Sequence, residues 1–416
     1  MGWLKRSRTS RVGSAVDEGP SRAGSQAGGD AVEVREVTTR RELDQFVKLP
    51  WPIYAGDPHW VPPLLIEVKE FLNRKKHPFY LHGDATQFLA LRGGAAVGRI
   101  LVSDDPNFNQ AHGTNLGCFG LFESVDDPRV AQALLAAAAE WLRAKGRTAI
   151  LGPIDYSMNY PCGLLLEGFD TPPRIMMNHH PPYYAALLES CGLAKAKDLY
   201  GWWFADPYDM VSQWRRRAEW LARRGRVTVR AFRKRDFEAD VQRARDVYCS
   251  AYEKNWGFVR LTDAEFRYLA RQLARIAVPE MVLLAEADGK PVGFSITLPD
   301  VNEAIRPLDG RLTTLGLPIG LARLLLRFPK IKTARMLVLV VLEGYRRRGV
   351  SELLILHTLD YGKNVLGYTA AELSWTLEDN DLINRTIEAV GGRRYKTYRI
   401  YEKDISPPSG RPASQT

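Results

Sequence analysis

Leu342-Glu-Gly-Tyr-Arg346-Arg-Arg-Gly349-Val-Ser351-Glu-Leu353 joins the end of an apolar strand to the start of an apolar-periodic helix through three arginines and a glycine. Backbone N–H groups at such a helix start, together with flanking arginines, are suited to bind the oxygens of a pyrophosphate. Gly349 permits a close backbone approach or a positive φ angle. A basic helix start on a solvated face fits the same residues, and spacing alone supports the two interpretations equally.

The elements around this stretch form a series that the first half of the chain repeats. In the second half we predict the hairpin Met281–Ala287 and Lys290–Thr297, the strand Met336–Leu342, the helix Val350–Leu366, the strand Tyr368–Leu377, the helix Asn380–Val390 and the strand Tyr395–Glu402. In the first half we predict the hairpin Gln87–Arg92 and Ala95–Val102, then Leu116–Phe122, the helix Asp127–Lys145, Thr148–Ile154, the helix Pro182–Cys191 and Leu199–Phe204. Two such series predict an α/β (α+β) fold of two tandem domains, each a mixed twisted sheet flanked by helices.

The composition is that of a folded protein with more than one domain. The chain has 416 residues, of which 45% are hydrophobic and 25% charged, and this suffices for two cores. Its four cysteines form no C-x-x-C pair, which indicates thiols in a reducing compartment. No apolar run reaches the roughly 18 residues of a spanning helix, and no signal peptide is recognisable. We therefore expect a cytosolic protein, soluble or peripheral to a membrane.

The net charge of +10 is concentrated in one strip. Ten arginines and lysines against one acid lie between Arg215 and Arg235, so a local anionic partner is expected: a membrane surface, RNA or a phosphate-rich ligand. Trp214, Ala218 and Leu221 share one helical face there, which is typical of a basic interfacial helix. A linker helix with its tryptophans in the core fits the same pattern.

These features divide the chain into five segments. We predict a disordered tail over 1–30, a first domain over 31–210, a basic amphipathic linker helix over 211–225, a second domain over 226–404 and a disordered tail over 405–416.

The motif Arg346-x-x-Gly349-x-Ser351 resembles the acyl-CoA pyrophosphate loop of the GCN5-related N-acetyltransferase (GNAT) superfamily. The hairpin with Val292-Gly293 and the later Asn380 fit the layout of that superfamily. The first half has Ser-Val-Asp-Asp-Pro-Arg after Glu123 in place of such a loop. The resemblance therefore implies a degenerate first domain and one site, in the second domain, for acyl-CoA as co-substrate, with no permanently bound cofactor and no metal.

The same resemblance implies which residues bind acyl-CoA. The backbone of Leu339–Val341 would pair with the pantetheine arm, and the position that often holds the proton-donating tyrosine of the superfamily is Ile387. The implied acyl-CoA-binding residues are Leu339, Val341, Arg346, Arg347, Arg348, Gly349, Val350 and Ser351.

Further motifs resemble the bacterial ceramide synthase-like family of tandem GNAT proteins over most of residues 33–404. They are Pro50-Trp-Pro-Ile-Tyr54, Asp57-Pro-His-Trp-Val-Pro-Pro63, Gly117-Cys-Phe-Gly-Leu-Phe-Glu123, Gly152-Pro153, Gly163-Leu-Leu-Leu-Glu-Gly-Phe-Asp170, Pro181-Pro-Tyr-Tyr184 and Lys197-Asp-Leu-Tyr200. This resemblance implies transfer of a fatty acyl group from a long-chain acyl-CoA to the amine of a sphingoid base.

An apolar insertion over 301–332 separates two strands of the second domain. Its segment 312–332 contains Pro318, Arg323 and Arg327, so it is too short and too interrupted to span a bilayer. Apolar residues fringed by Arg and Lys suit a cover for the acyl chain or an element that contacts a membrane, and an additional core helix is the alternative. With the basic strip, the insertion favours binding to anionic lipid at the cytoplasmic face of the inner membrane.

Amide formation needs a neutral amine and a proton for the departing thiolate. On the strand 371–378, alternation places Glu372, Ser374, Thr376 and Glu378 on one face, and Glu378 and Asn380 lie at the carboxyl end. We expect Glu378 to act as base or amine ligand, with Asn380 as a further catalytic residue. Glu343 is the alternative base. A carboxylate that caps the following helix explains Glu378 equally well.

Three residues are assigned to the substrate: Tyr156 and Asn159, in a polar segment after Gly152-Pro153, and Trp375. A self-contained turn is the competing explanation for the first two. His179-His180 lacks the acid that an HHxxxxD motif requires, and His77 and His82 lack a third ligand, so no metal site is expected.

Two other functions compete with a lipid N-acyltransferase. A GNAT enzyme could acetylate a small amine or transfer aminoacyl groups, but a small acyl group needs no apolar insertion. A non-catalytic RNA- or membrane-binding protein could use the basic strip, but aromatic residues for base stacking are few beside it, and no nucleic-acid partner is expected.

Overall fold

A computed structural model describes residues 31–205, 215–216, 219–220, 223–224, 226–346 and 348–407. In this part of the chain, one mixed sheet of 13 strands runs through both halves. In spatial order the strands are β1 (Val32–Glu36), β2 (Asp84–Arg92), β3 (Ala95–Asp104), β4 (Leu116–Ser124), β5 (Ala149–Gly152), β13 (Arg393–Asp404), β7 (Ala194–Phe204), β12 (Ala370–Leu377), β11 (Thr333–Val341), β10 (Lys290–Pro299), β9 (Val282–Ala287) and β8 (Val227–Ala231). The short β6 (Leu164–Glu167) pairs with β13. The mixed α/β fold with two strand-rich series is as the sequence predicts.

Both predicted hairpins form, because their turns contain the residues that a tight turn requires. Gly93 and Gly94 have φ angles of 56° and 82°, and Asp288 and Gly289 have φ angles of 49° and 75°. Two successive positive φ angles match the right-handed twist of the flanking strands and favour a glycine-containing two-residue turn. The turns set the register of β2 with β3 and of β9 with β10.

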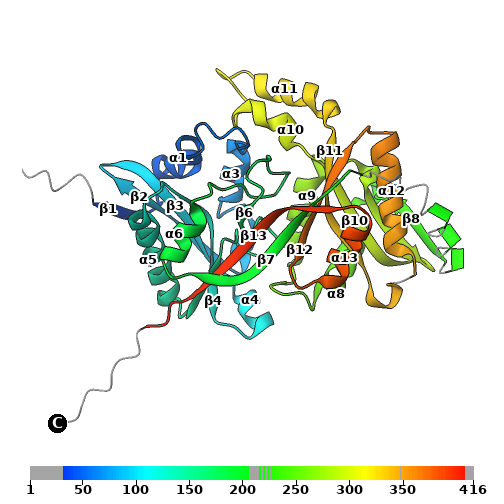
Figure 1. Cartoon of the computed structure of the whole chain (residues 1–416), viewed down its shortest axis with the longest axis horizontal. Helices are drawn as coiled ribbons and strands as arrows, with labels where there is room; N and C mark the ends of the chain where they lie inside the picture. Colours follow the sequence, from blue (N-terminus) through cyan, green and yellow to red (C-terminus); the bar gives the residue numbers. More distant parts are fainter. Residues whose placement is uncertain are drawn as a thin grey trace, which may run out of the picture.

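Helices cover both faces of the sheet (Figure 1). In the first half α5 (Pro128–Ala144) packs on β1–β4 through Val130, Leu134, Ala138 and Leu142, which recur every four residues on one face. The other helices of this half are α1 (Arg40–Lys48), α2 (Pro50–Ile53), α3 (Leu65–Phe71), η1 (Pro78–Leu81), α4 (Pro106–His112) and α6 (Tyr184–Ser190).

In the second half α12 (Val350–Asn364) packs on one face of the sheet and α8 (Phe237–Tyr252) on β10 and β11. Gly293 on β10 allows the close contact with α12, since a Cβ atom there would lie 3.1 Å from Val350. The remaining helices are η2 (Lys234–Asp236), α9 (Asp263–Ala274), η3 (Pro279–Met281), α10 (Asn302–Ile305), η4 (Arg306–Leu308), α11 (Ile319–Arg327), η5 (Phe328–Lys330), η6 (Glu343–Tyr345) and α13 (Asp381–Ala389).

The two halves exchange their last strands. β7 ends the first half but pairs with β12 of the second half, and β13 ends the chain but pairs with β5 of the first half. The long pair β7–β13 therefore lies at the centre of the sheet, as Figure 1 shows. The domain boundaries 31–210 and 226–404 remain a prediction. The strand pairing shows that the last strand of each half completes the sheet of the other half.

The predicted tails and linker fall mostly outside the described residues. The residues outside the described structure include 1–30, Trp214 and most of the predicted linker helix 211–225. The prediction of a tail from residue 405 begins too early, because Ile405 is buried and its carbonyl oxygen accepts from Arg143 Nε at 2.6 Å. The part 408–416 lies outside the described residues.

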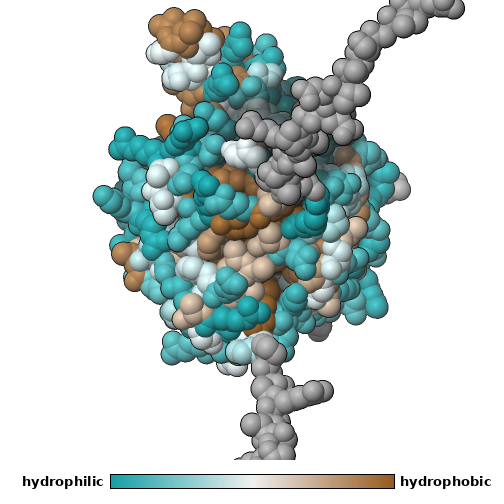
Figure 2. All heavy atoms as spheres, turned by 90° about the vertical axis from the view of Figure 1, so that its left-hand side faces the viewer, coloured by the Kyte–Doolittle hydropathy of each residue, from teal (hydrophilic) through white to brown (hydrophobic). Residues whose placement is uncertain are grey.

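The insertion 301–332 forms α10, η4, α11 and η5 and projects from the second half (Figure 1). Its inner side packs on the body through Leu324 and Phe328. Its outer side exposes six apolar side chains: Leu315, Leu317, Ile319, Leu321, Leu325 and Leu326. Figure 2 shows hydrophobic residues at the tip of a projection above the rest of the molecule. No helix in the described part of the chain is long and apolar enough to cross a membrane.

Candidate active site

A cavity of about 2420 Å³ lies beside β11, between α8 and α9 on one side and α13 and the start of α12 on the other. α8 and α9 line it mainly with apolar side chains: Val241, Ala244, Tyr252, Phe266, Leu269 and Leu273. Arg346, Ser351 and Glu352 line the end beside α12. A polar end and a long apolar wall therefore belong to one continuous space.

The cavity exists because β11 and β12 separate. Their parallel pairing runs from Thr333 opposite Ala370 to Met336 opposite Leu373 and then stops, although both strands continue. Beyond that point the edge of β11 facing β12 has no strand partner among the described residues. Backbone groups along this edge are free to bind an extended ligand as a further strand would.

The register of β11 with β10 determines which backbone groups face the opening. Leu337 is an extra residue in this pair, since Ile296 lies opposite Val338 and Thr297 opposite Met336. Above this bulge the Leu342 N–H donates to the Val292 carbonyl at 2.9 Å. By alternation, the backbone N–H and C=O groups of Leu339 and Val341 point away from β10 into the opening.

The loop after β11 places a helix start at the polar end of the cavity. Gly349 is the N-cap of α12 with a φ angle of 81°, and no described side chain caps the helix there. The first N–H groups of α12, at Val350 and Ser351, are thus available to an anion. Arg346 lines the cavity and its Nε lies 3.4 Å from the Val341 carbonyl oxygen.

Two other arginines belong to the predicted loop. The Arg348 guanidinium lies 5.1 Å from the centre of the Tyr345 ring. Arg347 lies outside the described residues. Of the predicted acyl-CoA residues, four line the cavity, in positions that suit a pyrophosphate at the start of α12 and an extended arm along β11: Leu339, Val341, Arg346 and Ser351.

Glu378 is not placed as predicted. Its Oε2 accepts from Lys195 Nζ at 2.5 Å and its Oε1 accepts from the Asp198 backbone N–H at 3.1 Å, so the carboxylate ties β12 to β7. Glu378 does not line the cavity. Because its carboxylate is bound to Lys195 and Asp198 outside the cavity lining, the structure does not support Glu378 as the base for an amine inside the cavity.

Asn380 and Glu343 both line the cavity. Asn380 is the N-cap of α13, and its side chain makes no capping hydrogen bond. Glu343 is largely exposed, with its Oε2 3.7 Å from Lys254 Nζ. Both residues remain candidates for guiding the acceptor amine.

Of the three predicted substrate residues, two line the cavity. Asn159 accepts from the Tyr248 hydroxyl at 2.9 Å and donates to the Val259 carbonyl at 3.1 Å, and Trp375 lies on β12. Tyr156 is fully buried away from the cavity, where its ring stacks on Phe79 at 4.6 Å. Its assignment to the substrate is wrong because the turn that follows β5 directs this side chain into the first-half core.

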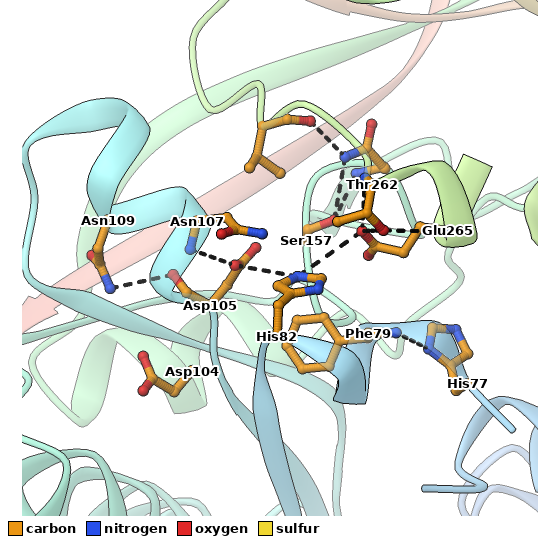
Figure 3. A network of polar contacts seen from close by, with 12 residues as sticks. His77, Phe79, His82, Asp104, Asp105, Asn107, Asn109, Ser157, Thr262 and Glu265 are labelled. Carbon is orange, nitrogen blue, oxygen red and sulfur yellow. Dashed lines mark hydrogen bonds and ion pairs between the residues drawn. The ribbon is translucent and has the colours of Figure 1, made fainter. Parts of the chain in front are cut away.

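A polar network fixes the segment that carries Asn159 (Figure 3). Asn159 donates to Ser157 Oγ at 3.4 Å. Next to it, His82 Nε2 lies 3.5 Å from the buried Asp105 carboxylate and 4.0 Å from Glu265, which caps α9 through Thr262. The network joins the first half to α9, the helix that lines the apolar wall.

The sequence prediction missed the buried cluster at the point where β11 and β12 part. Arg335 Nε lies 2.5 Å from Ser374 Oγ and 3.4 Å from Glu372 Oε1, and both charged side chains are almost completely buried. Burial lowers the pKa of Arg335, and the Glu372 carboxylate opposes this shift. The pattern of 371–378 gave Glu372 and Ser374 a common face, but only the pairing brings Arg335 to them.

His179 and His180 are bound to groups of the first half. His179 Nε2 lies 2.8 Å from the Asp57 carboxylate and His180 Nδ1 accepts from the Leu165 N–H at 3.2 Å. Burial lowers the pKa of His180 to about 3, so this ring is neutral. Within the described ranges, no group of three or more His, Cys, Asp or Glu side chains could hold a metal ion.

A sheet that opens beside an uncapped helix start is the arrangement expected of GNAT N-acyltransferases. In agreement, the model of the "Acetyltransferase (GNAT) family" matches residues 241–386. A tandem GNAT protein from the clavulanic acid biosynthesis pathway has the same fold, with a TM-score of 0.54, 15% identity and coverage of 91% of this chain and 100% of that one. A GCN5-related N-acetyltransferase from Sphaerobacter thermophilus gives a TM-score of 0.50 at 13% identity, covering 90% and 96%.

Two curated proteins are similar over nearly their whole length. The bacterial ceramide synthase of Caulobacter vibrioides is 38% identical and covers 90% of this chain and 98% of its own length. Protein YghO of Escherichia coli is 35% identical, covering 89% and 95%. The chain belongs to the family of tandem GNAT N-acyltransferases that contains these two proteins, as the sequence motifs predicted. It is an acyl-CoA-dependent N-acyltransferase.

Proposed function

We propose that the protein transfers a long fatty acyl group from acyl-CoA to the amine of a sphingoid base. The supporting observation is the continuity of the cavity, which joins the anion site at Ser351 to the apolar wall of α8 and α9. An acetyl group would leave most of that wall without a partner, whereas alkyl chains would remove its apolar surface from water. The family relationship to a bacterial ceramide synthase supports the same substrates.

The polar groups of the cavity fit the head of such an acceptor. Asn159 and Asn380 provide amide groups at the surface of the cavity, and Glu343 provides a carboxylate at its mouth. Amides can bind hydroxyl or keto groups, and a carboxylate attracts an ammonium group. We assign Asn159 and Trp375 to the acceptor.

The purified protein is expected to release CoA thiol from palmitoyl-CoA only when sphinganine or 3-oxosphinganine is added. Thiol release is followed in a colorimetric assay, and the N-acyl product is identified by mass spectrometry. Turnover of acetyl-CoA with a small amine, without turnover of either long-chain base, would contradict the proposed substrates. Omission of the acceptor is the control for hydrolysis.

We further propose that the insertion 301–332 contacts the surface of an anionic membrane. None of residues 301–332, all of which lie in the described structure, lines the cavity, so a cover for the acyl chain is not supported. Leu325 and Leu326 are 65% and 72% exposed, while Arg323 and Arg327 flank them on the same helix. Apolar side chains with a basic fringe suit insertion at the level of lipid headgroups.

Replacing both Leu325 and Leu326 by aspartate is expected to lower binding to vesicles with anionic lipid at least tenfold. Each leucine would otherwise bury its side chain in the membrane, which contributes roughly 1.5–3 kcal/mol, and the added negative charges repel anionic lipid. Sedimentation with vesicles measures the effect. Leu81→Asp is the matched control, because Leu81 is 76% exposed on η1. Equal binding of the double variant and the control would contradict a role of α11.

A further inference from the structure

Ser374 occupies the position on β12 where the sheet opens. The last pair of β11 with β12 joins Met336 to Leu373, and Ser374 is the next residue. A pantetheine arm bound along the edge of β11 from Val341 to Met336 would follow five residue steps, about 17 Å of strand. Its reactive end would therefore lie near this point, where Ser374 lines the cavity.

The hydrogen bonding of Ser374 leaves its own proton available. Arg335 Nε donates to Ser374 Oγ at 2.5 Å, so the serine oxygen acts as acceptor in this contact. The hydroxyl hydrogen is then free to donate to another group. Arg335 is held in place by Glu372 and by the carbonyl oxygen of Ile175. A fixed guanidinium stabilises negative charge that develops on the serine oxygen during proton transfer.

Other proton donors line the cavity, among them Thr297, which lies opposite Met336, and Ser374 differs from it by its contact with Arg335. Ile387 lines the cavity and has no proton to give. The Tyr248 hydroxyl donates to Asn159, and burial raises the pKa of Tyr248. Thr376 also lines the cavity and accepts from Trp202 Nε1 at 2.8 Å, but that donor is neutral. Of the hydroxyl groups on β12, only Ser374 contacts a cation.

We propose that Ser374 relays a proton from the attacking amine to the departing thiolate. The neutral amine forms a C–N bond with the thioester carbonyl carbon, and the C–S bond then breaks. As it breaks, the serine hydroxyl gives its proton to the sulfur and takes one from the nitrogen, so the products are an amide and CoA thiol. Arg335 is the positioning residue, since it orients the serine oxygen. This inference rests on the proposed amide-forming reaction at this cavity.

Ser374→Ala is expected to lower kcat by a factor of about 10²–10³, the range of a lost general acid–base group, without changing the KM for palmitoyl-CoA. Ser374→Thr retains a hydroxyl group and should recover most of kcat. Thr228→Val removes a strand hydroxyl on β8, outside the cavity lining, and is the matched control, expected within about threefold of the unmodified protein. Melting temperatures of all variants show whether each is folded.

Several outcomes would overturn the proposal. The first is a kcat of Ser374→Ala within about threefold of that of the unmodified protein. The second is a loss of kcat/KM in Ser374→Ala that comes entirely from a higher KM. The third is a Ser374→Thr variant that is folded but as slow as Ser374→Ala. All rates are measured with palmitoyl-CoA and both sphinganine and a small primary amine. If the unmodified protein uses only the small amine, the sphingoid acceptor is wrong and Ser374 is judged on that amine. If it acylates neither, both proposals fail.

Discussion

Gly349→Val is expected to weaken acyl-CoA binding by a factor on the order of 10–100, about 1.4–2.8 kcal/mol. Gly349 has a φ angle of 81°, a conformation that a β-branched residue adopts only with strain of about 1–3 kcal/mol. The loop can relieve this strain only by moving the first N–H groups of α12. Those groups, with Arg346, form the proposed anion site, so the strain acts directly on the pyrophosphate.

Gly344→Ala is the matched control for this loop. Gly344 belongs to the same loop but has no positive φ angle, and no described atom lies within 4 Å of where its Cβ would be. The alanine should leave acyl-CoA binding within about twofold of the unmodified protein. Binding is measured by calorimetry with palmitoyl-CoA and with CoA alone. Equal affinities of Gly349→Val and Gly344→Ala would show that the helix start does not hold the pyrophosphate.

Truncation after Gly392, which removes β13, is expected to leave no folded protein, including the first half. Three residues of β13 have exposed fractions of at most 1%: Tyr398, Ile400 and Tyr401. Losing one such aromatic side chain typically costs about 3–5 kcal/mol, and a whole domain is stable by only about 5–15 kcal/mol. The deletion would also expose the edges of β5 and β7 at the centre of the sheet, where unpaired strands promote aggregation.

The matched control is truncation after Pro407, which removes only residues outside the described structure. This protein should melt cooperatively at a temperature close to that of the full chain, as measured by circular dichroism and calorimetry. The protein truncated after Gly392 should show no cooperative transition and should elute as aggregate. A folded first half in that variant would contradict the interdependence of the two halves through β7 and β13.

The tandem arrangement could be predicted from the sequence, but the pairing of strands between the two halves could not. Alternation and turn residues are local, so 87–102 and 281–297 could be recognised as hairpins from the sequence. Which strand lies beside β5 depends on residues more than 200 positions apart, such as Tyr401 on β13, which lies opposite Gly152 on β5. Two similar sheets offer equivalent edges, and the sequence pattern does not distinguish them.

For the candidate site, too, the sequence predicted local features but not the contacts between distant segments. The sequence predicted a helix start after Gly349, and the structure has one, because such a loop is contiguous in the chain; the role of Gly349 and Arg346 in anion binding stays a prediction. Glu378 was misassigned because a strand pattern gives the face of a side chain but not its partner, and Tyr156 because the polar composition of its segment does not show that its ring is buried. Lys195 on β7 and Phe79 on η1 decide those positions.

The sequence by itself determined the two hairpins, the two strand-rich series and the family, because each depends on residues close together or on motifs read in order. Only the tertiary structure decided that the last strands are exchanged, that β11 and β12 part at Met336 and Leu373, and that Arg335 meets Ser374 there. The physical reason is that pairing and burial between distant segments depend on the packing of the whole sheet, and a local pattern carries no record of that packing.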